Sequence, residues 1–265
     1  MPDANLRPIA FVIAATNHGS LLVNRHDYHK VGDSGYGVGY QLLSTSAFDP
    51  QEADLLKQLL QTRKTNFGEG VVALDCGANI GTLTVEWAKY MHGWGRVIAI
   101  EAQERIFYAL AGNITLNNCF NARALWAAVG ATRSIIDVPV PDYFQPSSFG
   151  SLELHQTATT EFIGQAIDYA KEKCQPTQQL AIDDLALERL DFLKLDIEGM
   201  EMEALEGALQ TIARHRPQLF IEKIKTDETR LQHFLHSRDY KTYPMGINLL
   251  AIHASDPVTI TAAGS

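Results

Sequence analysis

Carboxylates and glycines stand where an apolar run of this sequence ends. In Val71–Leu83, "VVALDCGANIGTL", a run typical of a buried strand leads to Asp75, and Gly77 and Gly81 follow at once. Glycines let the backbone approach a ligand closely, and a helix after such a loop offers free amides and the positive end of its dipole. Glu101 ends a second apolar run, "RVIAIE". These residue types predict a ligand site with hydrogen-bond acceptors at its rim.

A third chemical group lies later in the chain, in "DFLKLDIEGMEMEALEGA". Lys194 and Asp196 are alternate residues, so in a strand they point to one face, and Glu198 follows in the next loop. Glu222 ends a further apolar run, "QLFIE". A lysine paired with Asp75, Glu101 or Asp196 would let several acids lie close together.

Alternating strand and helix patterns position these groups. Predicted strands cover residues 71–75, 96–101, 122–129, 191–196, 218–223, 240–244 and 248–253. Predicted helices cover residues 80–91, 104–117, 200–214 and 228–237. This alternation predicts an α/β fold with a mostly parallel sheet and helices on both faces, and the short last connection makes the final strand antiparallel. Ligands of such sheets bind beyond the carboxyl ends of the strands, where Asp75, Glu101 and Asp196 would meet.

The remaining segments are an N-terminal extension and an insertion. We expect residues 1–48 to pack on the core as an extension with short strands in "IAFVIAAT" and "GYGVGYQLL". The main domain is expected over residues 49–265, and its first helix begins at Asp49, which would cap the free amides ahead of Pro50. Residues 132–179 are expected to be an irregular insertion or lid near the ligand site. Within it, "FIGQAIDYAKEKC" is compatible with helix or strand.

The composition disfavours several classes of protein. A formal net charge of -9 does not suit nucleic-acid binding, which selects a basic surface. Three cysteines without paired or metal-ligand spacing predict no disulfide framework. The short apolar run near the N-terminus lacks the positive start and the length of a signal peptide, and nothing approaches the roughly 20 apolar residues of a membrane span. We expect a cytoplasmic protein without a membrane partner, and its oligomeric state is open.

The glycine loop favours a particular nucleotide. Its spacing lacks the G-x-G-x-x-G pattern of dinucleotide folds, and Asp75 would repel a diphosphate. The amino group and the sulfonium of S-adenosyl-L-methionine suit a carboxylate. Glu101, at about the usual offset from the loop, would accept hydrogen bonds from both ribose hydroxyls, and the small Ala127 and Ala128 could cover the adenine ring. Taken singly, Asp75 could be a helix cap and Glu101 a solvated strand end.

These motifs resemble the FkbM-type methyltransferases, a branch of the class I S-adenosylmethionine-dependent fold. "LDCGANIGTLT" is similar to the family's first motif, and "AIEAQERIFYALAGNITLNN" to its second-strand acid and following helix, in which Asn113 matches a recurrent Asn. The most specific match is the Lys-x-Asp-x-Glu-Gly-x-Glu pattern at residues 194–201. Gln103 departs from the family, many members of which have Pro or Asn there. The resemblance covers roughly residues 49–253.

The resemblance implies a Rossmann-like class I methyltransferase sheet. It also implies S-adenosylmethionine-dependent O-methylation of a hydroxyl on a small molecule, such as a saccharide, a polyketide or another secondary metabolite. The expected cofactor-binding residues are Asp75, Gly77, Ala78, Asn79, Gly81, Thr82, Glu101, Ala127, Ala128 and Asp196.

An alcohol acceptor must lose its proton to a base within hydrogen-bond reach. We expect Asp196 or Glu198 to be that base or to orient the acceptor hydroxyl, with Lys194 as a structural counter-ion. The alternative is a buried charge network that only holds strand ends together. Mg²⁺ on Asp196, Glu198 and Glu222 would be a metal-assisted variant, but no metal is expected.

Two other functions stay open. A nicotinamide-dependent oxidoreductase is disfavoured by Asp75 and by the missing second glycine, and a non-catalytic nucleotide-binding protein could keep the same fold. A nucleic-acid base methyltransferase is disfavoured by the net charge and by the absence of a Pro-Pro-aromatic turn. Some side chains of the extension and the insertion could line an acceptor pocket, although surface positions are the simpler interpretation. They are His26, Tyr28, His29, Tyr36 and His155.

Overall fold

The computed structural model of the chain describes residues 7–32 and 34–258 and has one large central sheet. Its strands are β5 (Val71–Cys76), β6 (Gly95–Glu101), β7 (Ala122–Trp126), β11 (Phe192–Leu195), β12 (Gln218–Glu222), β13 (Tyr240–Met245) and β14 (Asn248–His253). The order across the sheet is β13-β14-β12-β11-β5-β6-β7. Strands β12, β11, β5, β6 and β7 run parallel, whereas β14 is inserted between β12 and β13 and is antiparallel to both. The predicted α/β class I methyltransferase sheet with an antiparallel last strand is confirmed.

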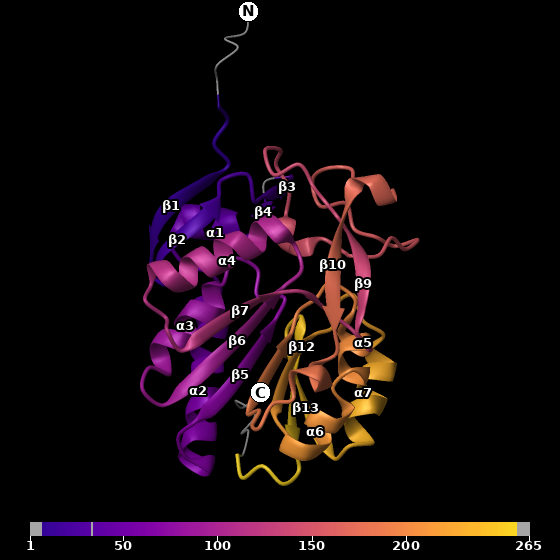
Figure 1. Ribbon diagram of the computed structural model, residues 1–265. Coiled ribbons are helices and arrows are strands. Elements are labelled where there is room, and N and C mark those ends of the chain that lie inside the picture. The colour runs from indigo at the N-terminus through magenta and orange to yellow at the C-terminus, as the bar shows by residue number, and fades with distance from the viewer. Residues whose placement is uncertain (1–6, 33, 259–265) are drawn as a thin grey trace, which may run out of the picture.

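Helices cover both faces of this sheet (Figure 1). One face packs on α2 (Pro50–Phe67), α3 (Thr82–Tyr90) and α4 (Glu104–Leu116), and the other on α5 (Glu201–Glu206), α6 (Leu209–His215) and α7 (Glu228–His236). Strand β5 is buried throughout, because its alternate residues serve the two faces. Val71 and Ala73 belong to the first apolar cluster, and Val72 and Leu74 belong to the second.

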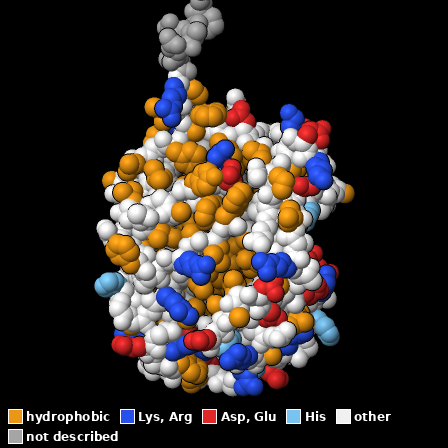
Figure 2. Space-filling view, in the orientation of Figure 1, with side chains coloured by type: hydrophobic (Ala, Val, Ile, Leu, Met, Phe, Trp, Pro, Cys, Tyr) orange, Lys and Arg blue, Asp and Glu red, His pale blue; other side chains and the backbone are white. Residues whose placement is uncertain are grey.

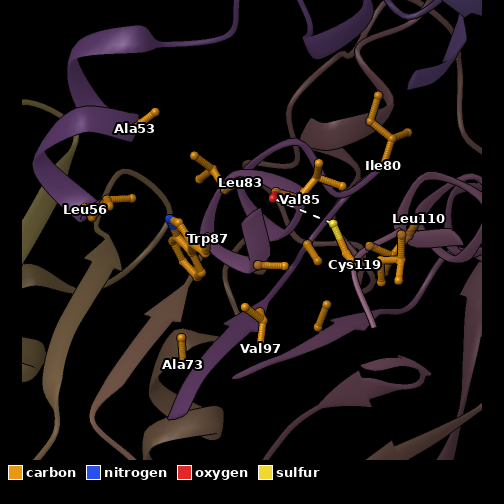
Figure 3. Close-up of a cluster of buried hydrophobic side chains, with 14 of the residues drawn as sticks. Ala53, Leu56, Ala73, Ile80, Leu83, Val85, Trp87, Val97, Leu110 and Cys119 are labelled. Atoms are coloured by element: carbon orange, nitrogen blue, oxygen red, sulfur yellow. Dashed lines mark hydrogen bonds between the residues drawn. The ribbon is translucent and has the colours of Figure 1, made fainter. Parts of the chain in front are cut away.

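The first cluster seats the helix that follows the glycine loop. Figure 3 shows Leu56 of α2 and Leu83 and Trp87 of α3 among the side chains that gather above Ala73 of β5. The ring of Trp87 meets the ring of Phe192 edge-on, with centroids 5.4 Å apart. This packing ties α3 to β5 and β11, so the loop between β5 and α3 has a rigid base on both sides.

The N-terminal segment is a layer of small elements docked on α4. A hairpin of β1 (Phe11–Thr16) and β2 (Gly19–Asn24) is followed by β3 (His29–Val31), β4 (Ser34–Tyr36) and α1 (Val38–Thr45). Asn113 of α4 accepts a hydrogen bond from the Leu22 amide at 2.6 Å and donates to the Leu22 carbonyl at 3.2 Å. The expected strand in "IAFVIAAT" is present. The extension boundary at residue 48 stays a prediction, and its residues 1–6 and 33 lie outside the described residues, as do residues 259–265 of the expected domain.

Two local predictions for the N-terminal part are wrong. "GYGVGYQLL" is a strand only at Gly35 and Tyr36, which belong to β4, because residues from Val38 onward form α1. The carboxylate of the buried Asp27 accepts the Gly39 amide at 2.8 Å and so stabilises the first turn of that helix. Asp49 precedes α2, but it has a left-handed φ of 36° and its side chain accepts no hydrogen bond from the first turn. Pro50 opens the helix as expected.

The predicted strand over residues 122–129 divides between two sheets. After β7 the chain leaves the central sheet, and β8 (Ala128–Val129) joins β9 (Ser134–Pro139) and β10 (Cys174–Leu180) in a small sheet of order β8-β10-β9. The insertion over residues 132–179 is therefore only partly irregular, since β9 and β10 pair antiparallel along their length. The "FIGQAIDYAKEKC" stretch is mostly neither helix nor strand, although it ends at the start of β10.

The helix predicted over residues 200–214 is interrupted between α5 and α6. A Cβ on Gly207 would lie 2.2 Å from the Gly130 carbonyl oxygen, so the backbone touches the β8 loop at this point. Asp183 accepts the amides of Gln210 and Thr211 and provides the second helix with a new start. In the part of the chain that the structure describes, no helix has the length and apolar character needed to cross a membrane.

Candidate active site

The acids at the ends of neighbouring strands surround one cavity of about 290 Å³. The sequence-predicted residues that line it are Asp75, Gly77, Ala78, Asn79, Thr82, Glu101, Ala127, Ala128, Asp196 and Glu198. Gly81 is absent from the lining. A Cβ at Gly81 would lie 2.5 Å from Leu110 Cδ1, so this glycine allows the start of α3 to approach α4. The assignment of the lining residues to a ligand stays a prediction.

Asp75 is a buried carboxylate with one free oxygen. Its Oδ2 accepts a hydrogen bond from the Thr84 hydroxyl at 2.6 Å, whereas Oδ1 has no partner among the described residues. Burial raises the pKa of this carboxyl, and the nearby Lys194 ammonium opposes the rise. An oxygen of this kind calls for a hydrogen-bond donor, since a buried acceptor without one costs free energy. Asp75 is therefore no helix cap, and its free oxygen suits an amino group of a ligand in the cavity.

Glu101 ends β6 and holds the glycine loop. Its carboxylate accepts the Asn79 amide at 3.0 Å and the Gln103 amide at 2.7 Å. It is only 6% exposed, so the interpretation as a solvated strand end is wrong. Burial raises its pKa to about 7, although the backbone hydrogen bonds oppose the rise. Each carboxylate oxygen can accept a further hydrogen bond, which leaves capacity for the hydroxyls of a ribose.

Gly77 joins the glycine loop to the end of β11. It has a φ of 75°, and a Cβ there would lie 1.7 Å from the Asp196 carbonyl oxygen. No side chain fits at such a distance, so the two loops can touch only because residue 77 is glycine. This contact brings the first strand end and the Asp196 loop to the same side of the cavity.

Lys194 is the counter-ion of the central acids. It is the register partner of Asp75 across β11 and β5, and its Nζ donates to Asp196 Oδ2 at 2.8 Å. Burial lowers the pKa of Lys194, but the carboxylates of Asp196 and Asp75 outweigh burial and raise it above the ordinary value. Lys194 therefore stays charged, which agrees with the structural role expected for it.

Glu198 is held by a lysine that the sequence reasoning missed. Glu198 has a left-handed φ of 57°, and its Oε2 accepts a hydrogen bond from Lys225 Nζ. Lys225 also donates to the Ser151 carbonyl at 3.1 Å and lies 3.0 Å from a carboxylate oxygen of Glu161. Burial, followed by the charge of Asp196, raises the pKa of Glu198 to about 8. Lys225 thus ties the insertion to the Asp196 loop, a link between distant segments that no local pattern signals.

Glu201 is fully buried and holds the backbone on both sides of Glu198. Its carboxylate accepts the amides of Ile197 at 3.0 Å and Gly199 at 3.1 Å and the Thr226 hydroxyl at 2.6 Å. The final Glu of the Lys-x-Asp-x-Glu-Gly-x-Glu pattern therefore does not face the cavity, and it fixes the backbone that carries Glu198.

Glu222, at the end of β12, completes an acidic cluster in the cavity. It is 7% exposed, and its Oε2 has no partner among the described residues. One carboxylate oxygen from each of Asp196, Glu198 and Glu222 lies within 4.8 Å of the others. Burial and the two neighbouring carboxylates raise the pKa of Glu222 to about 9.

Gln103, the residue that departs from the family pattern, anchors the insertion. Its side-chain amide donates to the Phe149 carbonyl at 2.8 Å and accepts the Tyr143 hydroxyl at 3.1 Å. Asp27 of the N-terminal segment reaches the same place, since its Oδ1 accepts the Phe149 amide at 3.0 Å. The insertion and the N-terminal segment therefore meet beside the acid of β6.

Further lining residues come from these two segments and from the sheet, and no sequence pattern pointed to most of them. They are Tyr36, Gly37, Val38, Gln41, Phe48, Ser148, Gly150, Ser151, Leu152 and Leu154, with Glu52 of α2 and Asn248 of β14. Tyr36 was a sequence candidate, and its hydroxyl contacts His29 Nδ1 at 2.6 Å. The other candidates, His26, Tyr28, His29 and His155, do not line the cavity.

The surface charge agrees with the composition. On the face that Figure 2 shows, Lys and Arg side chains lie among Asp and Glu side chains and form no continuous basic stripe. The cavity itself is rich in carboxylates, and its lysine, Lys194, is paired with Asp196. A polyanion such as nucleic acid would be repelled by such a cavity.

A family model described as the methyltransferase FkbM domain matches residues 75–242, which is more than half of the chain. The match begins at Asp75 and includes the strand ends that carry Glu101, Asp196 and Glu222. Among curated proteins no match is found.

Several solved structures are similar to the chain. One, described as methyltransferase FkbM from Methylobacillus flagellatus KT, is 19% identical with a TM-score of 0.49, and the match covers 72% of this chain and 48% of that one. A structure of monomeric WbdD is 11% identical with a TM-score of 0.47, over 82% and 44% of the two chains. A precorrin-6y C5,15-methyltransferase from Geobacter metallireducens GS-15 is 13% identical with a TM-score of 0.44, over 79% and 89%. The chain spans less than half of the length of the first two structures.

Proposed function

We propose that this chain, which belongs to the FkbM methyltransferase family, transfers a methyl group from S-adenosyl-L-methionine to a hydroxyl of a small molecule. Family membership and the chemistry of the cavity support methyl transfer from this cofactor. The acids Asp196, Glu198 and Glu222, which line one part of the cavity that we call the acceptor side, support a hydroxyl as the group that is methylated. The acceptor class proposed is a polyhydroxylated or oxygenated small molecule such as a saccharide or a polyketide.

The observation that carries the proposal is the free Oδ1 of Asp75 in the same cavity as Glu101. A buried carboxylate oxygen without a donor fits the amino group of the cofactor, and the carboxylate of Glu101 fits the ribose hydroxyls. Ala127 and Ala128 offer a small-residue wall at the end of β7, which leaves room for an adenine ring. When bound, the cofactor supplies a methyl group on a sulfonium, which is an excellent leaving group.

The residues of the chain then have to position an acceptor and accept its proton. Asp196 has a side chain that is 36% exposed, and Lys194 holds only one of its two oxygens, so the other can accept a hydrogen bond from an acceptor hydroxyl. Glu198 lies beside it and is held by Lys225. We assign Asp196 or Glu198 as the base that takes the hydroxyl proton, and the loops held by Glu201 and Gly77 keep both in place. Alignment of acceptor and cofactor in one cavity is itself worth about 7–11 kcal/mol of barrier.

Calorimetric titration tests the cofactor assignment directly. S-adenosylhomocysteine is expected to bind the wild-type protein in a 1:1 complex and to raise its Tm, whereas NAD is expected to do neither. Binding of NAD but not of S-adenosylhomocysteine would replace the proposal by the oxidoreductase, and binding of neither nucleotide would refute it.

Turnover then tests the base. Wild type, Asp196→Asn and Glu198→Gln are compared for transfer of a labelled methyl group to a panel of hydroxylated acceptors, and Glu228→Gln, an exposed acid of α7, serves as the matched control. At least one of the first two variants is expected to lose 100-fold or more in kcat while its affinity for S-adenosylhomocysteine changes little. Wild-type turnover in both variants would contradict the base assignment. If S-adenosylhomocysteine binds but wild type methylates no acceptor of the panel, the result favours the non-catalytic nucleotide-binding protein.

A further inference from the structure

The acceptor side of the cavity contains one acid that the methyl-transfer proposal leaves without a role. Glu222 sits at the end of β12, is 7% exposed, and accepts no hydrogen bond at Oε2 from any described residue. Its register partner across the sheet is Asn248, whose amide donates instead to Glu52 at 2.8 Å. A buried carboxylate in this situation is stable only with a cation, a proton or a ligand donor beside it.

Two further carboxylates point to the same place. One oxygen from each of Asp196, Glu198 and Glu222 lies within 4.8 Å of the others. Lys194 takes one oxygen of Asp196, and Lys225 takes one oxygen of Glu198. Each of these two acids therefore keeps a second oxygen for another partner, and Glu222 keeps both.

The spacing is within reach of a hard divalent cation. Neighbouring ligand oxygens lie about 3 Å apart around Mg²⁺ and roughly 3.5 Å apart around Ca²⁺. Because the three carboxylate oxygens lie within 4.8 Å of one another, side-chain rotations can bring them together around such an ion. Three carboxylate ligands also leave coordination positions open toward the cavity.

We propose that Asp196, Glu198 and Glu222 bind a divalent metal ion, with Mg²⁺ or Mn²⁺ as the chemical class, and that its open positions hold the hydroxyl of the acceptor. The binding site stands on the geometry of this chain alone, and its role toward the acceptor rests on the proposed methyl transfer. An ion held there would orient the acceptor oxygen and lower the pKa of its hydroxyl. Since Lys194 and Lys225 each hold the other oxygen of Asp196 and Glu198, the second oxygen of Glu222 would be the one left to receive the hydroxyl proton. The expectation of no metal made from the sequence is thereby replaced by a proposal.

Metal titration of the full chain tests this inference without any acceptor. Protein freed of metal with a chelator is titrated calorimetrically with Mn²⁺, and Mg²⁺ is used as competitor. Wild type is expected to bind one Mn²⁺, Glu222→Gln and Asp196→Asn are expected to bind it at least tenfold more weakly, and Glu228→Gln, a surface acid paired with Lys223, is expected to match wild type. No saturable binding by wild type, or equal binding by Glu222→Gln and wild type, would overturn the site.

S-adenosylhomocysteine affinity and Tm of every protein are measured alongside. They identify a variant that fails to fold, in which case the second variant decides. They also separate the two proposals, because S-adenosylhomocysteine binding without Mn²⁺ binding overturns only the metal site. Mn²⁺ binding without S-adenosylhomocysteine binding overturns only the methyl transfer.

Discussion

Replacing Asp75 by Asn tests how the cavity recognises a ligand. The side chains have nearly the same shape, and the carbonyl oxygen of Asn can still accept the Thr84 hydroxyl now bound to Asp75 Oδ2. Its NH₂ group then occupies the position of Oδ1, which has no partner among the described residues. A donor thus replaces the unpartnered acceptor of Asp75, while the hydrogen bond with Thr84 is kept.

The size of the effect follows from the kind of hydrogen bond that is lost. A hydrogen bond between charged groups contributes about 1.5–3 kcal/mol, so Kd for S-adenosylhomocysteine is expected to rise about 10- to 150-fold. Folding should suffer less, because the buried charge of Asp75 disappears together with its attraction to Lys194, and the two changes oppose each other.

The assay is calorimetric titration with two ligands. S-adenosylhomocysteine carries the amino group, whereas 5′-methylthioadenosine has the same adenosine and sulfur without the amino acid. Asp75→Asn is expected to weaken the first ligand about 10- to 150-fold and the second less than threefold. Glu101→Gln should weaken both ligands alike, because both contain the ribose. Asp49→Asn removes the same charge from an exposed lining position and should change neither.

The pattern across the two ligands decides the outcome. If Asp75→Asn weakened both ligands equally, the carboxylate would contact the adenosine or act through the fold, and the assignment to the amino group would be wrong. If it weakened neither, Asp75 would face no ligand at all, and the chief support for the proposed cofactor would be lost.

Three other changes have defined outcomes. Burial raises the pKa of Glu101 to about 7, so its contribution to the stability of the free protein is complete below about pH 4.5 and is lost as the pH rises through 7. Affinity for S-adenosylhomocysteine should rise over the same range, by up to about tenfold per pH unit, because the ionised carboxylate binds the ribose hydroxyls. Tm and Kd measured from about pH 5 to 8 check both trends, and Glu101→Gln should flatten them. Asn113→Ala removes hydrogen bonds to Leu22 and to the Ile80 carbonyl and should lower the free energy of unfolding by about 3 kcal/mol in urea titration. A loss below about 1 kcal/mol, on the order of one ordinary hydrogen bond, would mean that the docking of β2 on α4 does not depend on Asn113. Glu201→Ala should lower the free energy of unfolding by at least about 3 kcal/mol in the same assay. Glu201→Gln should lower it clearly less, because Gln can still accept the amides of the Glu198 loop and can donate to the Thr226 hydroxyl. Equal losses of unfolding free energy would show that the charge of Glu201, rather than its hydrogen bonds, holds the loop.

Much of the fold could be predicted from local patterns. Strand β5 and the strands that follow it read as apolar runs at regular intervals, and the alternation with helices restricts the connections to a parallel sheet. Once that sheet is accepted, Asp75, Glu101 and Asp196 must come together, because the carboxyl ends of parallel strands share one edge. The predictions that failed concern short segments such as Val38–Thr45, where a contact from the distant Asp27 decides the backbone.

The sequence by itself therefore determined the sheet, the family pattern and the strand-end acids, since periodicity and chain direction are local properties. Only the tertiary structure decided that Oδ1 of Asp75 has no partner among the described residues, that Gln103 holds the insertion, and that Lys225 binds Glu198. Each of these facts depends on where side chains from separate segments point after packing. Burial and hydrogen bonding, which set the chemistry of those groups, arise only in the packed chain.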